Sequence, residues 1–240
     1  MTGVGWFIPE YLLLVGTFVA LFAERISRRD GAGAGAGALF AAAAVVAAVV
    51  IGARPAAFGG VLQLDAVAVT VRVALASLSA VYLVWLSARG IEPERSREAA
   101  ALVLLATLGG MLMVASRDLM VLFVSIELAT MPAYVLMGYR RDDERSLEAA
   151  LKYFLLSMTT SLVMLYGFSF LFGIAGSTSF SVIGAVRGAG LLGTFAAVFA
   201  FVGLFAKMSA APFHYGAPDA YAGAPAASVA FVSTVTKVAG

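Results

Sequence analysis

Long apolar runs separated by short polar segments dominate the chain. A helix needs about 20 apolar residues to cross the roughly 30 Å of membrane hydrocarbon, and seven runs meet that length while an eighth is incomplete. The runs cover residues 7–24, 36–53, 62–88, 98–116, 118–139, 147–173, 191–212 and 226–240. Their apolar positions do not alternate as they would in the strands of a membrane barrel. The pattern therefore predicts an all-α, polytopic bundle of about eight transmembrane helices.

Composition narrows the class of protein further. Of the 240 residues, 62% are hydrophobic and 12% charged, whereas a soluble domain carries about 25% charged residues. The mean hydropathy is +0.97. These values exclude a water-soluble enzyme, a disordered chain and a nucleic-acid-binding protein. The chain has no Cys and one His, which excludes a disulfide framework, thiolate catalysis and a Cys- or His-rich metal site.

Arginine alternates in number from one connecting segment to the next. Three Arg follow each of the first, third and fifth runs, and one follows each of the second, fourth and sixth. They are Arg25, Arg28 and Arg29; Arg54; Arg89, Arg95 and Arg97; Arg117; Arg140, Arg141 and Arg145; and Arg187. By the positive-inside rule, the segments rich in Arg are expected in the cytoplasm and the N-terminus outside.

One acidic residue lies deep within an apolar run. Glu127 is near the midpoint of residues 118–139, about 15 Å from either membrane surface, where a charge costs about 2.5–3.5 kcal/mol. Thr130 and Tyr134 continue a polar stripe on its helical face, and no cation is three or four residues away. Any cationic partner must come from another helix. Glu127 is either a proton carrier or a protonated structural carboxyl.

The basic residues divide by type between the membrane and the loops. All three Lys, namely Lys152, Lys207 and Lys237, lie within apolar runs, whereas the loops use Arg. Arginine keeps its proton in proteins, but a buried lysine can release it. This division suits a chain that needs titratable bases inside the membrane and fixed charges outside it.

Lys207 lies shortly before a predicted break in the seventh run. Pro212 leaves the carbonyl of Met208 without its helical donor, and broken backbone within a membrane is tolerated only where protein or water satisfies it. Such helices mark ion sites in transporters; the alternative is a lysine that snorkels at a helix end. The predicted break includes Pro212, His214, Pro218 and Asp219.

The remaining polar residues within the runs leave two interpretations each. Lys237 shares a helical face with Ser233 and Thr234, whose hydroxyls can hold water beside an amine; the alternative is a structural lysine satisfied by other helices. Lys152 is spaced for an i,i+4 pair with Glu148, so a local ion pair competes with a functional role.

The single histidine and the charges of the first runs are equally open. His214 is either a proton relay near neutral pH or a structural loop residue. Arg72 and Asp65, seven residues apart, are expected to satisfy each other through water, and Glu10 to lie at the membrane interface.

Several segments carry a family resemblance. IELATMPAYVLMGY (126–139), SLEAALKYFLLS (146–157) and KMSAAPFHYGAPDAYAGAP (207–225) resemble the antiporter-like membrane subunits of respiratory complex I, the NADH–quinone oxidoreductase, above all its subunit N type. IPEYLLLVG near the start and VSTVTKVAG at the end agree with that type. The resemblance covers essentially the whole chain. Gly216 departs from it, because the family commonly has Trp there.

The resemblance implies a role for each matching residue. Glu127 matches the glutamate of the fifth helix, Lys207 the lysine of the broken seventh helix, and Lys237 the central relay lysine. Lys152 falls in a family motif with a weaker implied role. Pro212, His214, Pro218 and Asp219 match the signature of the break. A membrane subunit of a proton-translocating oxidoreductase is implied, with no redox chemistry in this chain.

The resemblance also implies a domain organisation and an assembly. The family is about twice as long, so this chain is expected to be the N-terminal half only. Residues 1–97 would form three leading helices, and residues 98–240 an incomplete first five-helix repeat. NADH, FMN, iron–sulfur clusters and quinone are expected in partner subunits and no cofactor in this chain, within a bacterial plasma (inner) membrane.

A mechanism follows from these residues as a hypothesis. An ion pair at 4 Å is worth about 4 kcal/mol at an effective dielectric of about 20, so separating Glu127 from Lys207 favours the neutral amine. The proton would then move toward Lys237 through water and the hydroxyls of Ser233 and Thr234. A subunit of a multi-subunit cation/proton antiporter is the alternative, because the same pair would serve it; a passive scaffold leaves the buried charges unexplained.

Overall fold

The computed structural model describes residues 3–27, 31–89, 93–186, 190–214 and 216–239. Within these ranges the chain forms ten α-helices and one two-stranded antiparallel hairpin. The helices are α1 Ile8–Ser27, α2 Ala32–Ile51, α3 Ala66–Arg89, α4 Pro93–Ala115, α5 Leu119–Met137, α6 Glu144–Ala175, α7 Phe180–Ala185, α8 Gly190–Met208, α9 Gly216–Gly223 and α10 Ala226–Ala239. The strands are β1 Arg54–Ala57 and β2 Leu62–Leu64. Two short 3-10 helices are η1 Gly3–Phe7 and η2 Phe58–Gly60.

Seven helices are long and apolar enough to cross a membrane: α1, extended by η1, then α2, α3, α4, α5, α6 and α8. The helix α10 is apolar but shorter. The all-α fold class is confirmed, and the protein is an integral, multi-pass membrane protein. Of the Arg residues that alternate between loops, Arg28, Arg29 and Arg187 lie outside the described residues.

The segments between the helices contain more structure than the apolar runs indicate. The run predicted as one helix from residue 62 instead begins with strand β2, and α3 starts at Ala66. Gly59 and Gly60 have positive φ, which lets the chain turn between the strands at no steric cost. Asp65 then accepts a hydrogen bond from the Ala68 amide at 2.8 Å, as helix-start residues do. The segment between the sixth and seventh apolar runs also contains helix α7.

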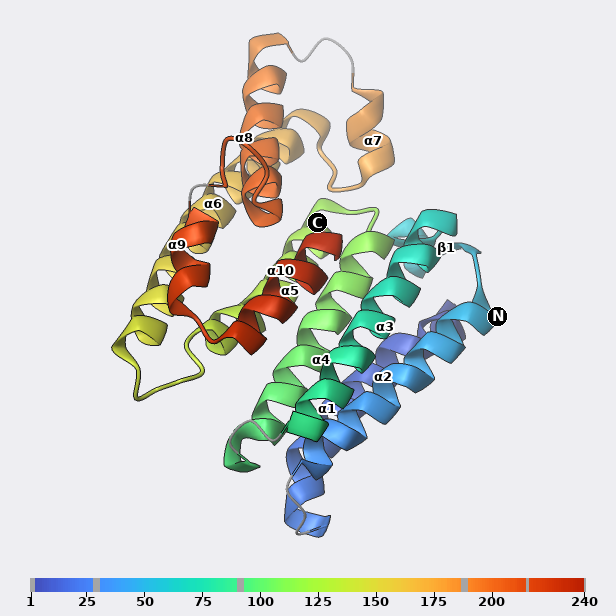
Figure 1. The fold of residues 1–240 in the computed structure, drawn as a ribbon. Helices are drawn as coiled ribbons and strands as arrows, with labels where there is room; N and C mark the ends of the chain where they lie inside the picture. The colour runs from blue at the N-terminus through green and yellow to red at the C-terminus, as the bar shows by residue number, and fades with distance from the viewer. Residues whose placement is uncertain (1–2, 28–30, 90–92, 187–189, 215, 240) are drawn as a thin grey trace.

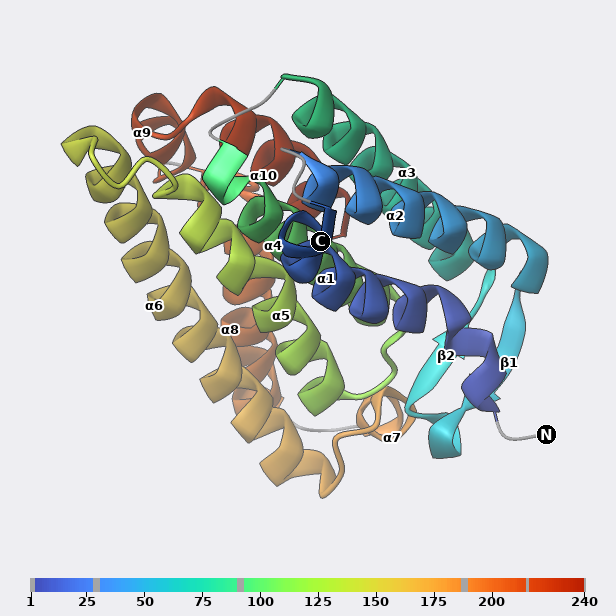
Figure 2. The same cartoon turned by 90° about the horizontal axis from the view of Figure 1, so that it is seen from below.

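Helices α1 to α4 form one packed group, and α5 lies against α4 (Figure 1). Helices α1 to α5 run side by side, and α10 packs on α3, α4 and α5. Helix α6 joins this group through α5, and α8 packs along α6 (Figure 2). Helix α9 also lies against α6. This arrangement brings α5, α6, α8 and α10, which are far apart in the sequence, around one region.

Small residues allow α6 and α8 to approach closely. A Cβ added at Gly203 would lie 2.2 Å from the Met164 Cβ and 2.9 Å from the Thr160 carbonyl oxygen. A Cβ at Gly167 would lie 2.5 Å from the backbone nitrogen of Ala200. Such close backbone contact is typical of helix pairs in membranes, where van der Waals packing drives association. The close contact between α6 and α8 places Ser157 and Ser161 of α6 beside the C-terminal end of α8.

A buried ion pair joins α1 to α3, and it corrects one expectation. Glu10 is 3% exposed, and the fully buried Arg72 donates to both of its carboxylate oxygens, at 2.8 and 2.6 Å. Asp65 instead pairs with Arg117. Arg72 and Asp65 therefore do not satisfy each other. The spacing of Arg72 and Asp65 along the chain predicted that they interact, but each of them instead pairs with a residue from another segment.

Candidate functional site

A buried acid–base pair lies where α5 meets the end of α8. The Lys207 ammonium is 3.2 Å from Glu127 Oε1, and the two side chains are 7% and 12% exposed. Glu127 is the ninth of 19 residues in α5, so at 1.5 Å per residue it lies about 12 Å from one helix end and 15 Å from the other. The pair therefore lies at the middle of the α5 span, a position where charges are costly unless they are functional or paired.

Hydroxyl groups surround the pair on two sides. From α6, Ser157 accepts from the Lys207 ammonium at 2.9 Å, and Ser161 donates to Glu127 Oε1 at 2.6 Å. From α5, Thr130 and Tyr134 lie 3.4 and 3.3 Å from the same ammonium. An ammonium has three protons, so it cannot bond to these three hydroxyls and Glu127 at once. It can therefore exchange the carboxylate for a hydroxyl by a small movement.

Lys237 of α10 contacts the end of the helix that carries Lys207. Its ammonium donates to the Lys207 carbonyl oxygen at 3.0 Å and to the Ser209 hydroxyl. Helix α8 ends at Met208, and Ser209 has a left-handed backbone with φ of 52°. The carbonyl that an uninterrupted helix would have satisfied thus accepts from Lys237. A cation at this position also complements the negative end of the helix dipole.

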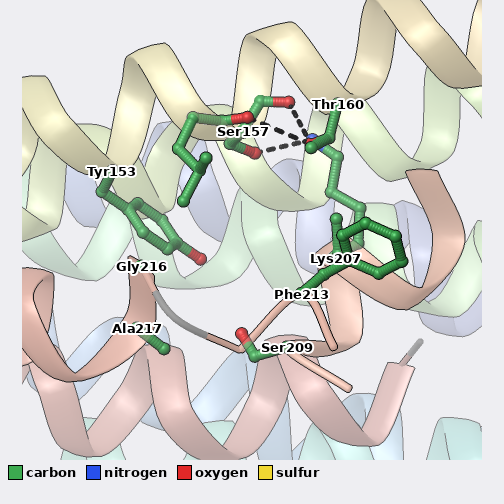
Figure 3. Close-up of a pocket in the computed structure, with 10 residues that line it drawn as sticks. Tyr153, Ser157, Thr160, Lys207, Ser209, Phe213, Gly216 and Ala217 are labelled. Carbon is green, nitrogen blue, oxygen red and sulfur yellow. Dashed lines mark hydrogen bonds between the residues drawn. The ribbon is translucent and has the colours of Figure 1, made fainter. Parts of the chain in front are cut away.

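A small cavity lies beside Lys207 and Ser209 (Figure 3). Its volume is about 30 Å³, and it is lined by Lys207 and Ser209 together with side chains of α6, among them Tyr153, Ser157 and Thr160. A cavity needs roughly 10–15 Å³ and two to four polar partners to hold a water. The space and its hydroxyls therefore suit one or two waters. Leu156 fills the place beside Gly216 where the family's tryptophan was expected, since a Cβ there would lie 2.0 Å from its Cδ2.

Lys152 lies apart from this pair. Its ammonium forms the i,i+4 ion pair with Glu148 at 2.7 Å, and a second with Asp219 of α9 at 2.9 Å. Lys152 is 48% exposed, and its ion pair with Asp219 ties the short helix α9 to α6 at the surface.

The other residues of the predicted break also lie away from the buried pair. His214, Pro212 and Pro218 are exposed, and His214 does not line the small cavity. Helix α8 stops four residues before Pro212, which confirms the broken seventh span. Among the described residues, no three His, Asp or Glu side chains lie close enough together to hold a metal ion.

The sequence interpretation missed three hydroxyls. Ser157 and Ser161 are one turn apart on α6, the spacing that marked Thr130 and Tyr134 on α5, so the same test would have found them. Ser209 had no such signal, because only the break in α8 brings it to Lys237. Conversely, Ser233 and Thr234 both donate to the carbonyl oxygen of Ala230 on their own helix. They do not bridge the lysines.

Comparison with protein families extends this description. Residues 116–240 match the family described as NADH:quinone oxidoreductase/Mrp antiporter, transmembrane. The NADH-quinone oxidoreductase subunit N of Sphingopyxis alaskensis is 37% identical over 236 residues, covering 96% of this chain and 49% of its own length. The corresponding subunit N of Rhodospirillum rubrum is 38% identical, with 97% and 50% covered. The chain thus spans about half the length of these curated relatives.

A solved structure agrees with these sequence matches. A chain of the respiratory complex I from Thermus thermophilus with bound aureothin superposes with a TM-score of 0.80 and 30% identity. That superposition covers 97% of this chain and 51% of the other. The fold around the Glu127–Lys207 pair is therefore one that occurs in a respiratory membrane complex.

Proposed function

Because this chain belongs to the NADH:quinone oxidoreductase/Mrp antiporter family of membrane proteins, we propose that it carries protons as part of an NADH–quinone oxidoreductase. Its relatives named subunit N support this choice over an antiporter without a redox partner. The observation that carries the proposal is the Glu127–Lys207 pair, which is buried at the centre of a membrane span. A purely structural pair there would be replaceable by apolar residues at little loss of stability.

The electrostatics of the pair allow it to act as a switch. At 3.2 Å and an effective dielectric of about 20, the attraction is about 5 kcal/mol. Separating Lys207 from Glu127 removes this stabilisation of the ammonium, while Ser157 and Tyr134 still hold the nitrogen in place. The proton is then more easily released. Ser161 stays on Glu127 and stabilises the carboxylate that is left alone.

The proton would leave Lys207 through the small cavity. It would pass from the Lys207 ammonium to Ser157 or a water, then across the cavity to Ser209, and finally to the Lys237 amine. Each carrier accepts one proton and gives one on, so only Lys207 and Lys237 change charge. The route requires Lys237 to be neutral on arrival. Two ammonium groups close to one helix end repel each other, which favours that state while Lys207 is charged.

The energy for separating the pair would come from quinone reduction in other subunits, which would hold NADH, FMN and the iron–sulfur clusters.

We further propose that residues 98–240 form the first repeat after three leading helices, in a bacterial plasma membrane with the N-terminus outside. The surrounding membrane subunits would supply the remainder of the proton path. Lys152 would act by holding α9 and the break in place.

The test uses the intact complex reconstituted in vesicles. Glu127→Gln and Lys207→Ala should each reduce proton uptake per quinone reduced by about tenfold or more, because the switch then lacks its acid or its base. Glu148→Gln, in the exposed pair with Lys152, is the matched control and should leave pumping nearly unchanged. Normal pumping in both variants of the buried pair would refute the proposal.

A further inference from the structure

Tyr153 of α6 is a polar residue of the small cavity that has no part in the route proposed above. It lines the cavity together with Ser157 and Ser209, and Figure 3 shows its hydroxyl pointing away from α6 toward the segment that carries Ser209. Its ring packs edge-on against Tyr134, with the ring centres 5.6 Å apart. The hydroxyl of Tyr153 therefore faces the cavity from a ring that is held in place.

The proton of the Tyr153 hydroxyl is used outside the cavity. Tyr153 forms a side-chain hydrogen bond with Thr236 of α10, which is 8% exposed and does not line this cavity. The Thr236 hydroxyl donates its single proton to the carbonyl oxygen of Val232, so Tyr153 has to be the donor in the bond that joins it to Thr236. The Tyr153 oxygen can therefore accept a hydrogen bond from a water in the cavity, but it has no proton left to donate to that water.

Ser157 offers the opposite polarity to the same cavity. Its hydroxyl oxygen accepts from the Tyr134 hydroxyl at 2.7 Å and from the Lys207 ammonium at 2.9 Å. Both lone pairs of that oxygen are then occupied, so Ser157 acts toward the cavity as a donor. A water placed there accepts from Ser157 and donates one proton to Tyr153, which leaves its second proton for Ser209.

A neighbouring hydroxyl also indicates water in this region. Tyr221 of α9 lies one turn beyond Ala217, which lines the cavity, and it acts electrostatically on Tyr153. The Tyr221 hydroxyl is buried and has no hydrogen-bond partner within the described part of the chain. Buried hydroxyls without a protein partner are normally satisfied by ordered water. The cavity volume of about 30 Å³ is sufficient for one water beside Tyr153.

We propose that Tyr153 is a positioning residue that holds a water of the small cavity between Ser157 and Ser209. This inference rests on the proposed function and gives its proton route a direction. Lys207 releases a proton to Ser157, and Ser157 passes its own proton to the water. The water then passes a proton to Ser209, which protonates the neutral amine of Lys237. Since one water proton is held by Tyr153, the proton that the water passes forward is the one that faces Ser209.

The first test removes the hydroxyl and keeps the ring. In the intact complex reconstituted in vesicles, Tyr153→Phe should slow proton uptake several-fold and raise its solvent deuterium isotope effect, because a misplaced water makes proton transfer the slow step. A residue that only supported the fold would not change the isotope effect. Tyr166→Phe is the control, at an exposed tyrosine of the same helix that does not line the cavity, and it should behave as the wild type. An unchanged rate and isotope effect in Tyr153→Phe would overturn the inference.

The second test acts on Tyr153 through Thr236. Thr236→Val keeps the shape of the side chain but removes the acceptor that fixes the Tyr153 hydroxyl, so it should reproduce the slow uptake and the raised isotope effect. Thr236→Ser keeps a hydroxyl and should retain the wild-type values. Tyr153→Phe combined with Thr236→Val should be no worse than either change alone, because both remove the same interaction. Additive losses in the double variant would show that the two residues act separately and would overturn the inference.

A measurement without turnover separates this inference from the proposed function. High-resolution maps of the intact complex should show water density within hydrogen-bond distance of Ser157, Tyr153 and Ser209, and Tyr153→Phe should lack that density. A wild-type map without water at Tyr153 would overturn the inference, whatever the pumping rates. If the water is present while Glu127→Gln and Lys207→Ala pump normally, the proposed function fails and the water-holding role of Tyr153 stands.

Discussion

The Glu127–Lys207 pair makes a quantitative prediction about stability that is separate from pumping. Glu127→Gln keeps the shape of the side chain and removes its charge, which leaves the Lys207 ammonium buried with hydroxyl partners alone. Removing one member of a buried pair typically costs about 3–5 kcal/mol. An upper bound comes from Lys207 releasing its proton, which at pH 7 costs a lysine of ordinary pKa about 5 kcal/mol. The hydroxyls of Ser157 and Tyr134 offset part of this, so we expect about 3 kcal/mol.

The matched variant is Glu127→Gln combined with Lys207→Met. It removes both charges and keeps similar side-chain volumes, so its stability should return to within about 1 kcal/mol of the wild type. For a unit of 150–250 residues, 1 kcal/mol shifts the melting temperature by about 2–4 °C. Glu127→Gln alone should therefore lower the temperature at which this chain unfolds in the detergent-solubilised complex by about 6–12 °C.

The assay is thermal denaturation of the purified complex, followed by native gel electrophoresis and detection of this chain. Glu148→Gln serves as control, because an exposed pair contributes at most about 1 kcal/mol. Recovery in the double variant is the decisive result. If the double variant were as unstable as the sum of the two single changes, the two groups would not be coupled and the assigned ion pair would be wrong.

Three further predictions concern other contacts. Glu10→Gln should destabilise the chain by about 3–5 kcal/mol, because it leaves the fully buried Arg72 without its carboxylate, and adding Arg72→Met should restore the melting temperature. Gly203→Val should cost at least about 1–3 kcal/mol through overpacking between α6 and α8, whereas Gly173→Val, with no atom within 4 Å of its added Cβ, should be nearly neutral in the same melt. Ser209→Ala should slow proton uptake several-fold without altering assembly. The control Ser233→Ala, at a serine that donates to its own helix, should leave proton uptake unchanged.

A feature of this protein could be predicted from the sequence when the residues that cause it lie close together in the chain. The membrane spans, the all-α fold and the break before Pro212 depend on residues close together in the chain. Hydrophobic length and the missing amide of proline act locally, so the sequence was sufficient for them. The hairpin before α3 was missed because its strands are only four and three residues long, and β2 lies at the start of an apolar run that continues into the helix.

Spacing along the chain could not predict ion pairs between distant segments, and the Glu127–Lys207 pair was expected only through the family resemblance. Arg72 and Asp65 share a face at a spacing of seven residues, yet Arg72 turns to Glu10 on α1 and Asp65 to Arg117. The choice depends on which helices lie next to each other. For the same reason, the i,i+4 partner of Lys152 was found from spacing, while its second partner, Asp219, was not.

The sequence by itself determined that a carboxylate and three amines lie within apolar runs long enough to span a membrane, and of these amines Lys152 is half exposed in the structure. Only the tertiary structure decided that the Lys207 ammonium lies 3.2 Å from Glu127, that Lys237 binds the end of α8, and that Ser157, Ser161 and Ser209 complete the site. A hydrogen bond forms within about 3 Å, whereas the sequence limits only the depth of each residue. Which groups come within that distance is settled by the close packing of α6 with α8 and of α5 with its neighbours.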